Sequence, residues 1–279
     1  MTDLASAIDE VARLLAAAGI AEARREARLL AGEATGLDKA AIIAHPEREL
    51  NPAESGRLAE FARRRQRREP ISRILGWREF WSLRFALGPE TLDPRPDSET
   101  LIAAALESAD RTKPLSVLDL GTGSGCLLLA LLSELPEARG LGIDLNAQTL
   151  AIAIANAESL GLSSRARFQR GDWASGLDER FDMVVCNPPY IPAGEIARLA
   201  PEVAEFDPLL ALAGGTDGLD AYRRLSGDLA RLLAPAGRAI VEIGAGQGAS
   251  AGAVLASRGL RLLGQRADLS GTPRCLILG

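Results

Sequence analysis

The sequence is poor in several residue types on which common catalytic and membrane-bound architectures depend. Its 279 residues include one histidine, His45, which argues against histidine triads and multi-histidine metal sites. Three widely spaced cysteines, Cys126, Cys186 and Cys275, lack metal-ligand spacing, and we expect reduced thiols in a cytoplasmic protein. The longest aliphatic run, residues 127–132, is too short to cross a bilayer, and the acidic residues near the N-terminus are unlike a signal peptide. We therefore expect a protein that is neither exported nor membrane-embedded.

An excess of positive charge is also absent. The 32 basic residues are outnumbered by 37 acidic ones, giving a net charge of −5, so no global basic field attracts nucleic acid or anionic lipid. Apolar residues make up 47% and charged residues 25% of the chain, which is typical of a folded globular protein. The length allows two domains or one large one.

The first part of the chain is predicted to be a small helical bundle. In residues 1–70, apolar residues recur at helical spacing and are interrupted by Gly19, Gly36 and Pro52, which predicts four or five helices. We expect His45 at a helix end or on the surface. The arginine-rich stretch at residues 63–68 has two interpretations: it binds an acidic protein partner or ribosomal RNA, or it forms a solvated helix face. The solvated face is favoured.

The remaining residues predict a linker followed by an α/β domain. Residues 71–95 are expected to form this linker, in which Trp77, Phe80, Trp81, Leu83 and Phe85 are mixed with charged residues, and we expect a β-hairpin at 74–87. From residue 96 to 279, strand and helix patterns alternate, which predicts a mostly parallel sheet with helices on both faces. Seven strands are expected, at residues 115–120, 140–143, 166–170, 183–186, 238–243, 261–265 and 274–278.

A glycine-rich loop follows the first of these strands. Gly121, Gly123 and Gly125 lack the β-carbons that would keep a ligand from the backbone, and the helix that follows offers free N–H groups. The nicotinamide fingerprint requires its third glycine one position later, where this chain has Cys126. The spacing therefore favours an adenosyl ligand without a pyrophosphate, and the alternative is a tight turn between strand and helix.

Polar and aromatic residues follow the next two strands. Asp144 ends the second strand and could accept hydrogen bonds from both ribose hydroxyls, or it could cap the helix that begins near Asn146. After the third strand, Asp172 could bind an adenine amino group and Trp173 could stack on the base. The sheet order of these elements favours a binding role.

The segment Asn187-Pro188-Pro189-Tyr190 follows a buried strand and is placed at the carboxyl edge of the sheet. The prolines remove two N–H donors, so that main-chain carbonyls and the Asn187 side-chain oxygen remain as acceptors. Such a set suits an NH2 group on a planar amide, adenine or guanine, with Tyr190 flat against it. Acceptors that bind the two hydrogens of this NH2 group draw its nitrogen toward the tetrahedral geometry of a transition state. If the nitrogen accepts a methyl group, we therefore expect that the transfer needs no strong base.

These motifs resemble those of class I S-adenosylmethionine-dependent methyltransferases, and further segments resemble the PrmC/HemK family. The similar segments are Glu69-Pro70 with residues 75–80, residues 92–99 (LDPRPDSE), residues 205–208 with 211–219 (ALAGGTDGL), and residues 242–244 (EIG) with 247–248. The resemblance implies a seven-stranded Rossmann-like methyltransferase sheet and methylation of N5 of the glutamine in the GGQ motif of peptide chain release factors.

The resemblance also implies site residues and partners. The donor S-adenosylmethionine, released as S-adenosylhomocysteine, is expected to contact Gly121, Thr122, Gly123, Ser124, Gly125, Asp144, Asp172, Trp173 and Asn187. The glutamine amide is expected to contact Asn187, Pro188, Pro189 and Tyr190, of which Asn187, Pro188 and Tyr190 are expected to be catalytic. We expect no metal, release factors 1 and 2 as protein substrates, no membrane or specific nucleic-acid partner, and a cytoplasmic monomer.

Some residues depart from the family pattern or have two interpretations. Asp93, Asp97 and Ser98 stand in the segment at 92–99 where the family pattern has an apolar residue, glutamate and threonine. Glu242 and Asp119 are interpreted either as site carboxylates or as supporting groups.

Three other functions fit parts of the sequence. A ribosomal-protein glutamine methyltransferase would use the same motifs and differ in its N-terminal region. An adenine-N6 DNA methyltransferase is less well supported, because residues 89–279 carry 17 basic against 24 acidic side chains. A non-catalytic binding module would have a broken glycine loop or NPPY segment, and both are intact.

Overall fold

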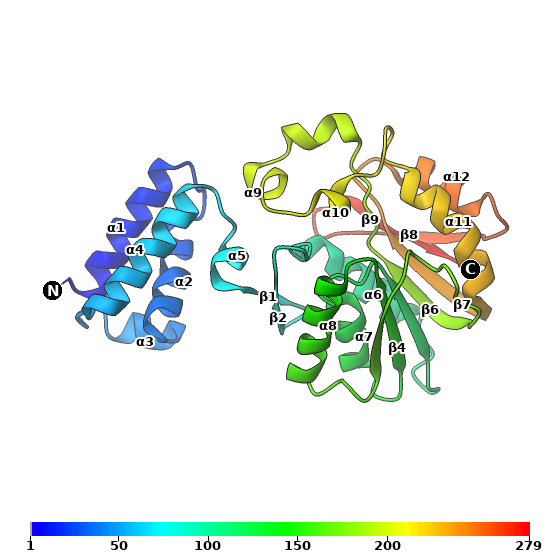
Figure 1. The fold of residues 1–279 in the computed structure, drawn as a ribbon, viewed down its shortest axis with the longest axis horizontal. Helices are drawn as coiled ribbons and strands as arrows, with labels where there is room; N and C mark the ends of the chain where they lie inside the picture. The colour runs from blue at the N-terminus through cyan, green and yellow to red at the C-terminus, as the bar shows by residue number, and fades with distance from the viewer. Residues whose placement is uncertain (1) are drawn as a thin grey trace. The chain divides into compact units, whose positions relative to one another are not determined.

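The computed structural model describes residues 2–279, and the chain separates into two compact units (Figure 1). The smaller unit contains the residues up to Gly76 together with the segment Ala200–Phe206, and the larger unit contains Trp77–Leu199 and Asp207–Gly279. The buried apolar residues of the smaller unit form one cluster, and those of the larger unit form two. Within residues 2–279, no helix is long and apolar enough to cross a membrane.

The smaller unit is helical, as its apolar spacing predicts. Its helices are α1 (Leu4–Ala17), α2 (Ala23–Thr35), α3 (Lys39–Ala44), α4 (Pro52–Gln66), α5 (Ile71–Leu75) and the short α9 (Pro201–Ala204). At the start of α4, the Asn51 side chain accepts from the Glu54 N–H and the Glu54 carboxylate accepts from the Asn51 N–H, both at 2.9 Å. This capping box satisfies two N–H groups that the helix itself cannot. His45 ends α3 with an exposed side chain, as expected.

The arginine-rich stretch at the end of α4 is not simply a solvated helix face, and that interpretation is wrong for Arg64, which pairs with Glu69, and for two further members. Arg65 has a side chain only 8% exposed and pairs with Glu26 of α2 at 2.6 Å and Glu202 of α9 at 3.1 Å. Arg68 pairs with Glu202 at 2.8 Å. Arg63, by contrast, is 65% exposed. The run therefore binds the segment Ala200–Phe206 to the helical bundle within the smaller unit.

We expect Arg65→Ala to lower the free energy of unfolding by about 3 to 5 kcal/mol, because it leaves the partly buried Glu26 carboxylate without its cation and leaves Glu202 with Arg68 alone. Arg63→Ala, in the same helix, should change it by less than about 0.5 kcal/mol. Urea denaturation of the full chain, followed by far-ultraviolet circular dichroism, measures both. Equal small effects of the two substitutions would contradict the structural role of Arg65.

The larger unit is built on a seven-stranded sheet, as predicted. Its strands are β3 (Ser116–Leu120), β4 (Arg139–Asp144), β5 (Ala166–Arg170), β6 (Phe181–Cys186), β7 (Leu233–Glu242), β8 (Leu262–Ala267) and β9 (Pro273–Leu278). They lie in the order β5-β4-β3-β6-β7-β9-β8, and β9 is antiparallel to both of its neighbours. The other neighbouring pairs are parallel. The mostly parallel sheet expected from the alternating pattern is confirmed.

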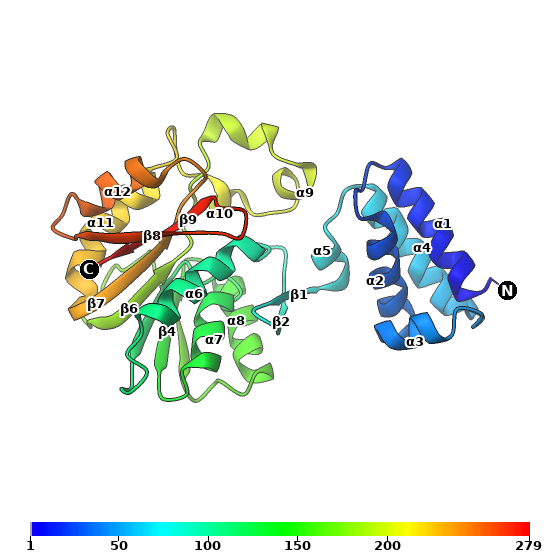
Figure 2. The same ribbon diagram turned by 180° about the vertical axis from the view of Figure 1, so that it is seen from behind.

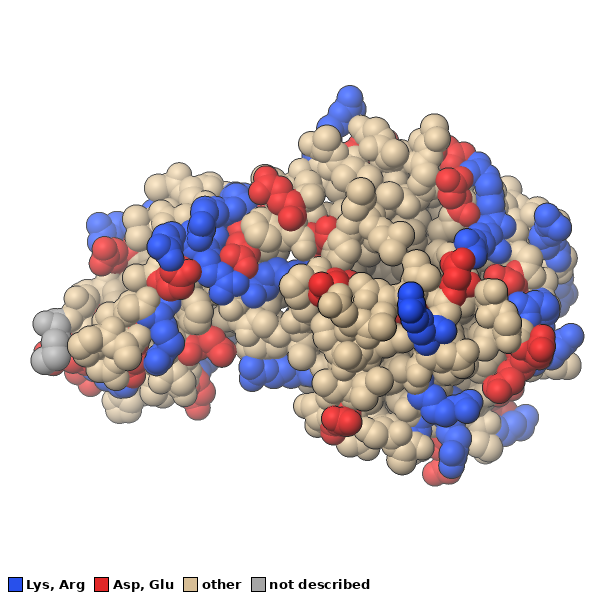
Figure 3. Space-filling model, viewed as in Figure 1, with Lys and Arg blue, Asp and Glu red and all other residues tan. Residues whose placement is uncertain are grey.

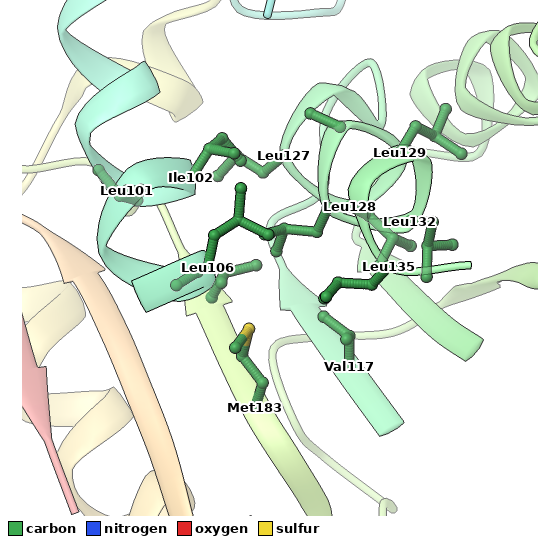
Figure 4. Close-up of a cluster of buried hydrophobic side chains, with 14 of the residues drawn as sticks. Leu101, Ile102, Leu106, Val117, Leu127, Leu128, Leu129, Leu132, Leu135 and Met183 are labelled. Carbon is green, nitrogen blue, oxygen red and sulfur yellow. The ribbon is translucent and has the colours of Figure 1, made fainter. Parts of the chain in front are cut away.

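Helices cover both faces of this sheet (Figures 1 and 2). The helices are α6 (Glu99–Ser108), α7 (Cys126–Glu134) and α8 (Ala147–Ser159) on one face, and α11 (Asp220–Leu232) and α12 (Gly248–Ala256) on the other. In Figure 4, Leu106 of α6 and Leu128 of α7 gather with Val117 and Met183 of the sheet. The aliphatic run at residues 127–132 is thus the buried centre of α7.

A hairpin of β1 (Trp77–Phe80) and β2 (Leu83–Ala86) begins the larger unit. The predicted hairpin is confirmed, but its expected start at residue 74 is wrong, because α5 continues to Leu75 and ends at Gly76 in a left-handed conformation. Other short elements are the 3-10 helices η1 (Pro96–Ser98) and η2 (Ala193–Arg198) and the α-helix α10 (Leu209–Leu212).

Candidate active site

The carboxyl ends of β3 and β6 lie side by side where the strand order reverses. From β3 the chain continues to β4 and β5 on one side, whereas from β6 it continues to β7 on the other. Open α/β sheets bind ligands at such a switch point. Leu120 pairs with Cys186 in the ladder, so Gly121 and Asn187 are the next residues at this edge. The glycine loop and the NPPY segment are therefore neighbours.

The glycine loop has the open backbone that a ligand requires. Gly121, Gly123 and Gly125 have φ values of +74°, +57° and +81°, which residues with a β-carbon rarely adopt. A β-carbon added at Gly121 would meet nothing within 4 Å, and at Gly123 only a carbonyl at 4.0 Å. The N–H groups of Gly121 and Thr122 both donate to the Ile143 carbonyl at 2.9 Å, which ties the loop to β4. The loop thus has room for a bound molecule against its backbone.

Asp144, at the end of β4, supports this loop directly. Its Oδ2 accepts from the Gly123 N–H and its Oδ1 from the Asn146 N–H, both at 3.0 Å. The cap of α8 is Asn146 itself, whose side chain accepts from the Gln148 N–H at 2.8 Å, so the interpretation of Asp144 as the helix cap is wrong. Each carboxylate oxygen can accept a second hydrogen bond. Asp144 remains able to bind a ligand hydroxyl.

The two residues expected to contact adenine have different environments. Trp173 is half-buried against the core beneath α11, and its φ of +55° is a strained conformation for a bulky residue. The adjacent Gly171 N–H donates to the Asp144 carbonyl at 3.0 Å, which brings this turn to the end of β4. Asp172 is exposed and forms an ion pair with Arg224.

The Asn187 side chain is oriented by a buried hydroxyl. Its Nδ2 donates to Oγ of Ser98, the last residue of η1, at 3.3 Å. The Ser98 side chain is almost fully buried. Within residues 2–279, the Oδ1 atom of Asn187 accepts no hydrogen bond. One acceptor oxygen is therefore presented at the switch point.

Tyr190 is held by both its hydroxyl and its backbone. The hydroxyl donates to Oε1 of Glu242 at 3.2 Å, and the Tyr190 carbonyl accepts from Nε2 of Gln247 at 2.9 Å. Gln247 in turn accepts from the Gly244 N–H at 3.0 Å. Burial and the neighbouring Glu242 raise the pKa of Tyr190 far above its ordinary value, so the hydroxyl stays a donor.

Two glycines pack against the NPPY backbone. A β-carbon on Gly214 would lie 2.8 Å from the Cα and carbonyl carbon of Tyr190, and one on Gly218 would lie 2.5 Å from the Tyr190 carbonyl oxygen. The Gly214 N–H donates to the Ile191 carbonyl at 2.9 Å. These close contacts are a physical reason for glycine at both positions.

Two buried carboxylates lie behind the site. Burial raises the pKa of Glu242 to about 7, although the Ser98 and Tyr190 hydroxyls act in the opposite direction. Burial likewise raises the pKa of Asp119 to about 7, and its Oδ2 accepts from the Thr122 hydroxyl at 2.6 Å. Asp119 thus supports the glycine loop, whereas Glu242 contacts the NPPY segment.

The cysteines beside these motifs have a packing role. Cys186 is fully buried, and burial raises the pKa of the Cys126 thiol to about 12, so neither is a reactive thiolate. Within the described part of the chain, no cluster of histidine, cysteine and carboxylate side chains is placed to hold a metal ion.

The predicted site omitted four residues that the structure places in it. Ser98, Gln247, Gly214 and Gly218 each contact the NPPY segment. All four lie in segments that resemble the PrmC/HemK family, so the motifs contained the signal. The contacts themselves could not be read from it, because the hydrogen bonds of Ser98 and Gln247 join residues that are 89 and 57 positions apart.

Comparisons with known proteins match both parts of the chain. Residues 6–76 match the model of the PrmC N-terminal domain, and residues 111–245 match that of a methyltransferase domain. A crystal structure of ribosomal protein L11 methylase from Lactobacillus delbrueckii subsp. bulgaricus is similar with a TM-score of 0.51 and 22% identity, covering 69% of this chain and 83% of that one. This last similarity supports the fold alone.

Curated relatives extend the similarity to nearly the whole chain. The release factor glutamine methyltransferase of Rhodospirillum rubrum is 49% identical over 270 residues, which are 97% of this chain and 83% of that protein. The release factor glutamine methyltransferase of Bradyrhizobium diazoefficiens is 46% identical over 275 residues, 97% of this chain and 93% of that protein. The chain belongs to the release factor glutamine methyltransferase family.

Proposed function

We propose that this enzyme transfers a methyl group from S-adenosylmethionine to N5, the side-chain amide nitrogen, of the glutamine in the Gly-Gly-Gln motif of peptide chain release factors. The observation that carries the proposal is the orientation of Asn187, whose Nδ2 is engaged by Ser98 while its Oδ1 is left as an acceptor. A substrate amide has two N–H donors to place against such acceptors. The family of the chain supports the same activity.

The acceptor side of the reaction follows from the NPPY segment. An amide nitrogen is a poor nucleophile because its lone pair is delocalised into the carbonyl group. Asn187 Oδ1 and the Pro188 carbonyl would accept its two hydrogens and draw the nitrogen toward the tetrahedral geometry of the transition state. Pro189 and Tyr190 would flank the amide plane. Orientation supplies much of the rate, and the proton leaves after the new N–C bond has formed, so no strong base is required.

The methyl donor would bind at the glycine loop, across the switch point from the NPPY segment. Bound S-adenosylmethionine supplies the methyl group from a sulfonium centre. The open backbone at Gly121 and Gly123 fits such a ligand, and no pyrophosphate is needed to fill it. The residues proposed to hold the donor are Gly121, Thr122, Gly123, Ser124, Gly125, Asp144, Asp172, Trp173 and Asn187.

Asp144→Ala is expected to weaken binding of S-adenosylhomocysteine, the donor product, by about 1.5 to 3 kcal/mol. The substitution removes charge-assisted hydrogen bonds to the ligand and also frees the Gly123 N–H. Asp144→Asn keeps one acceptor and should lose less. Isothermal titration calorimetry measures the affinities directly.

The matched control is Asp178→Ala, which removes an exposed carboxylate and should leave the affinity unchanged. Unchanged affinity in folded Asp144→Ala would exclude Asp144 from the donor site.

Two rival substrates differ in chemistry. A ribosomal-protein glutamine offers the same amide, whereas DNA adenine offers an exocyclic amine and requires a basic surface for the duplex. On the face of the larger unit shown in Figure 3, acidic side chains are interspersed among the basic ones. This distribution favours a protein substrate.

The proposed substrate is tested by supplying purified enzyme and labelled donor with release factor, ribosomal protein or DNA in separate reactions. Label is expected in the release factor. Label in the ribosomal protein or the DNA instead would replace the proposal with the corresponding rival.

We further propose a separate role for each of three parts of the chain. Residues 1–70 would recognise the release factor, residues 71–95 would link the parts, and residues 96–279 would bind the donor and carry out transfer. We propose that the enzyme acts as a cytoplasmic monomer, and light scattering of the purified protein tests its oligomeric state.

A further inference from the structure

The hydrogen bonds behind the NPPY segment converge on one carboxylate. Tyr190 donates its hydroxyl to Oε1 of Glu242 at 3.2 Å, and Asn187 donates Nδ2 to Ser98 Oγ at 3.3 Å. Because Ser98 accepts from Asn187, its own hydroxyl hydrogen is left for another acceptor, and the Glu242 carboxylate is beside it. Oε2 of Glu242 is buried and accepts no hydrogen bond within residues 2–279 that meets normal geometry.

The direction of each of these hydrogen bonds depends on the charge of Glu242. An ionised carboxylate only accepts, so both hydroxyls must donate to it. The Ser98 oxygen is then free to accept from Asn187 Nδ2, which turns Asn187 Oδ1 toward the switch point. A neutral group in place of the carboxylate can donate to Ser98, whose hydrogen is then free to turn toward Asn187. If the Asn187 amide rotated by 180°, its NH2 group would face the substrate NH2 group. Two donors would then oppose each other, and no hydrogen bond could form between them.

We propose that Glu242 is a positioning residue for methyl transfer, which acts through Ser98 to keep the Asn187 amide oxygen facing the substrate and through Tyr190 to hold the aromatic ring in place. The inference rests on the proposed function for its substrate. It also stands on sheet register, because Cys186 pairs with Val241 and this pairing places Asn187 and Glu242 at adjacent strand ends.

The ionisation of Glu242 depends on the groups packed around it. The titratable and charged groups that act on Glu242, or on which it acts, are Arg274 and Cys275 of β9, Asp97 of η1, Tyr190 of the NPPY segment, Cys186 of β6, Tyr222 of α11 and Cys126 of α7. Two further charges act on these groups, Arg95 on Tyr190 and Asp119 on the two cysteines Cys126 and Cys186. Arg274 lowers the pKa of Glu242, but it also pairs with Asp97 at 2.7 Å. Burial dominates and raises the pKa of Glu242 to about 7.

A pH dependence follows with a definite sign. At about pH 8 and above the carboxylate is mostly ionised and accepts both hydroxyls, so the rate of methyl transfer should reach its plateau there. As the pH falls through about 7, Glu242 takes up a proton and the rate should fall. In Glu242→Gln this group no longer titrates, so the rate should depend less steeply on pH, and the dependence that remains in this range belongs to Asp119, whose pKa is also about 7.

The test is single-turnover transfer to release factor with saturating donor. Glu242→Gln and Ser98→Ala are each expected to lower the rate on the order of 10²-fold, with no further loss in the double variant. Ser98→Thr retains the hydroxyl and should stay within a few-fold of the parent. Glu137→Gln, an exposed carboxylate of the larger unit, is the matched control and should change nothing. Parental rates in Ser98→Ala and Glu242→Gln, or a pH dependence in Glu242→Gln that is as steep as that of the parent, would overturn the proposal.

A second readout needs no turnover. The Asn187 side-chain amide protons, identified in nuclear magnetic resonance spectra by their loss in Asn187→Asp, should exchange slowly with solvent in the parent and faster in Ser98→Ala and Glu242→Gln. Equal exchange in all three would refute the positioning role. Absence of methylation by the parent enzyme would instead refute the proposed function, so the two failures are distinguishable.

Discussion

Asn187→Ala is expected to lower the single-turnover rate of methyl transfer about 10²- to 10³-fold. The substitution deletes the one side-chain oxygen that is presented for the substrate amide, while the buried Ser98 loses only the hydrogen bond it accepts. Saturating donor removes any effect on donor binding. Asn187→Asp retains an acceptor at this position and should keep a measurable fraction of the parental rate.

Gln265→Ala provides the matched comparison, because this side-chain amide is exposed on the edge strand β8 and should be dispensable. A parental rate in Asn187→Ala would remove Asn187 from the catalytic residues. The interpretation of the NPPY segment as the amide-binding site would then be lost as well.

Gly214→Ala is expected to reduce transfer on the order of 10²-fold without touching the substrate. The new methyl group would lie 2.8 Å from the Tyr190 backbone, and backbone atoms cannot move aside as a flexible side chain can. The NPPY segment must shift, and displacement of a positioning group by about 1 Å can cost about 10²-fold in rate. Stability should fall by about 1 to 3 kcal/mol from overpacking.

The comparison for this substitution is Gly194→Ala in η2. A β-carbon there meets nothing within 4 Å, so both rate and stability should be retained. Single-turnover kinetics and urea denaturation of the two variants separate a local displacement from a general intolerance of alanine. Full activity in Gly214→Ala would show that the NPPY backbone is not held as tightly as its contacts indicate.

The sheet and the placement of its motifs could be predicted from the sequence because they depend on local patterns. Short apolar strands alternate with helices, and connections in parallel sheets follow few topologies. Once β3 and β6 are recognised, Gly121 and Asn187 must meet at one edge of the sheet. The residues at which individual elements begin and end were less predictable, as the start of the hairpin shows.

The partners of charged and polar side chains could not be predicted in the same way. Arg65 looks like a member of a solvated run, and it is buried only because Glu26 and Glu202, 39 and 137 residues away, meet it in the folded chain. Likewise, Ser98 contacts Asn187 across 89 residues of sequence. Such contacts form only in the tertiary structure, and the helical and strand periodicity of the sequence does not indicate them.

The most direct test of the account is peptide mapping by mass spectrometry of a release factor after reaction with the enzyme and labelled donor. One methyl group is expected on the side-chain nitrogen of the glutamine in the Gly-Gly-Gln motif, and none in a release factor whose glutamine is replaced by alanine. A methyl group on any other residue, or an unmodified release factor beside a methylated ribosomal protein or adenine, would contradict the account.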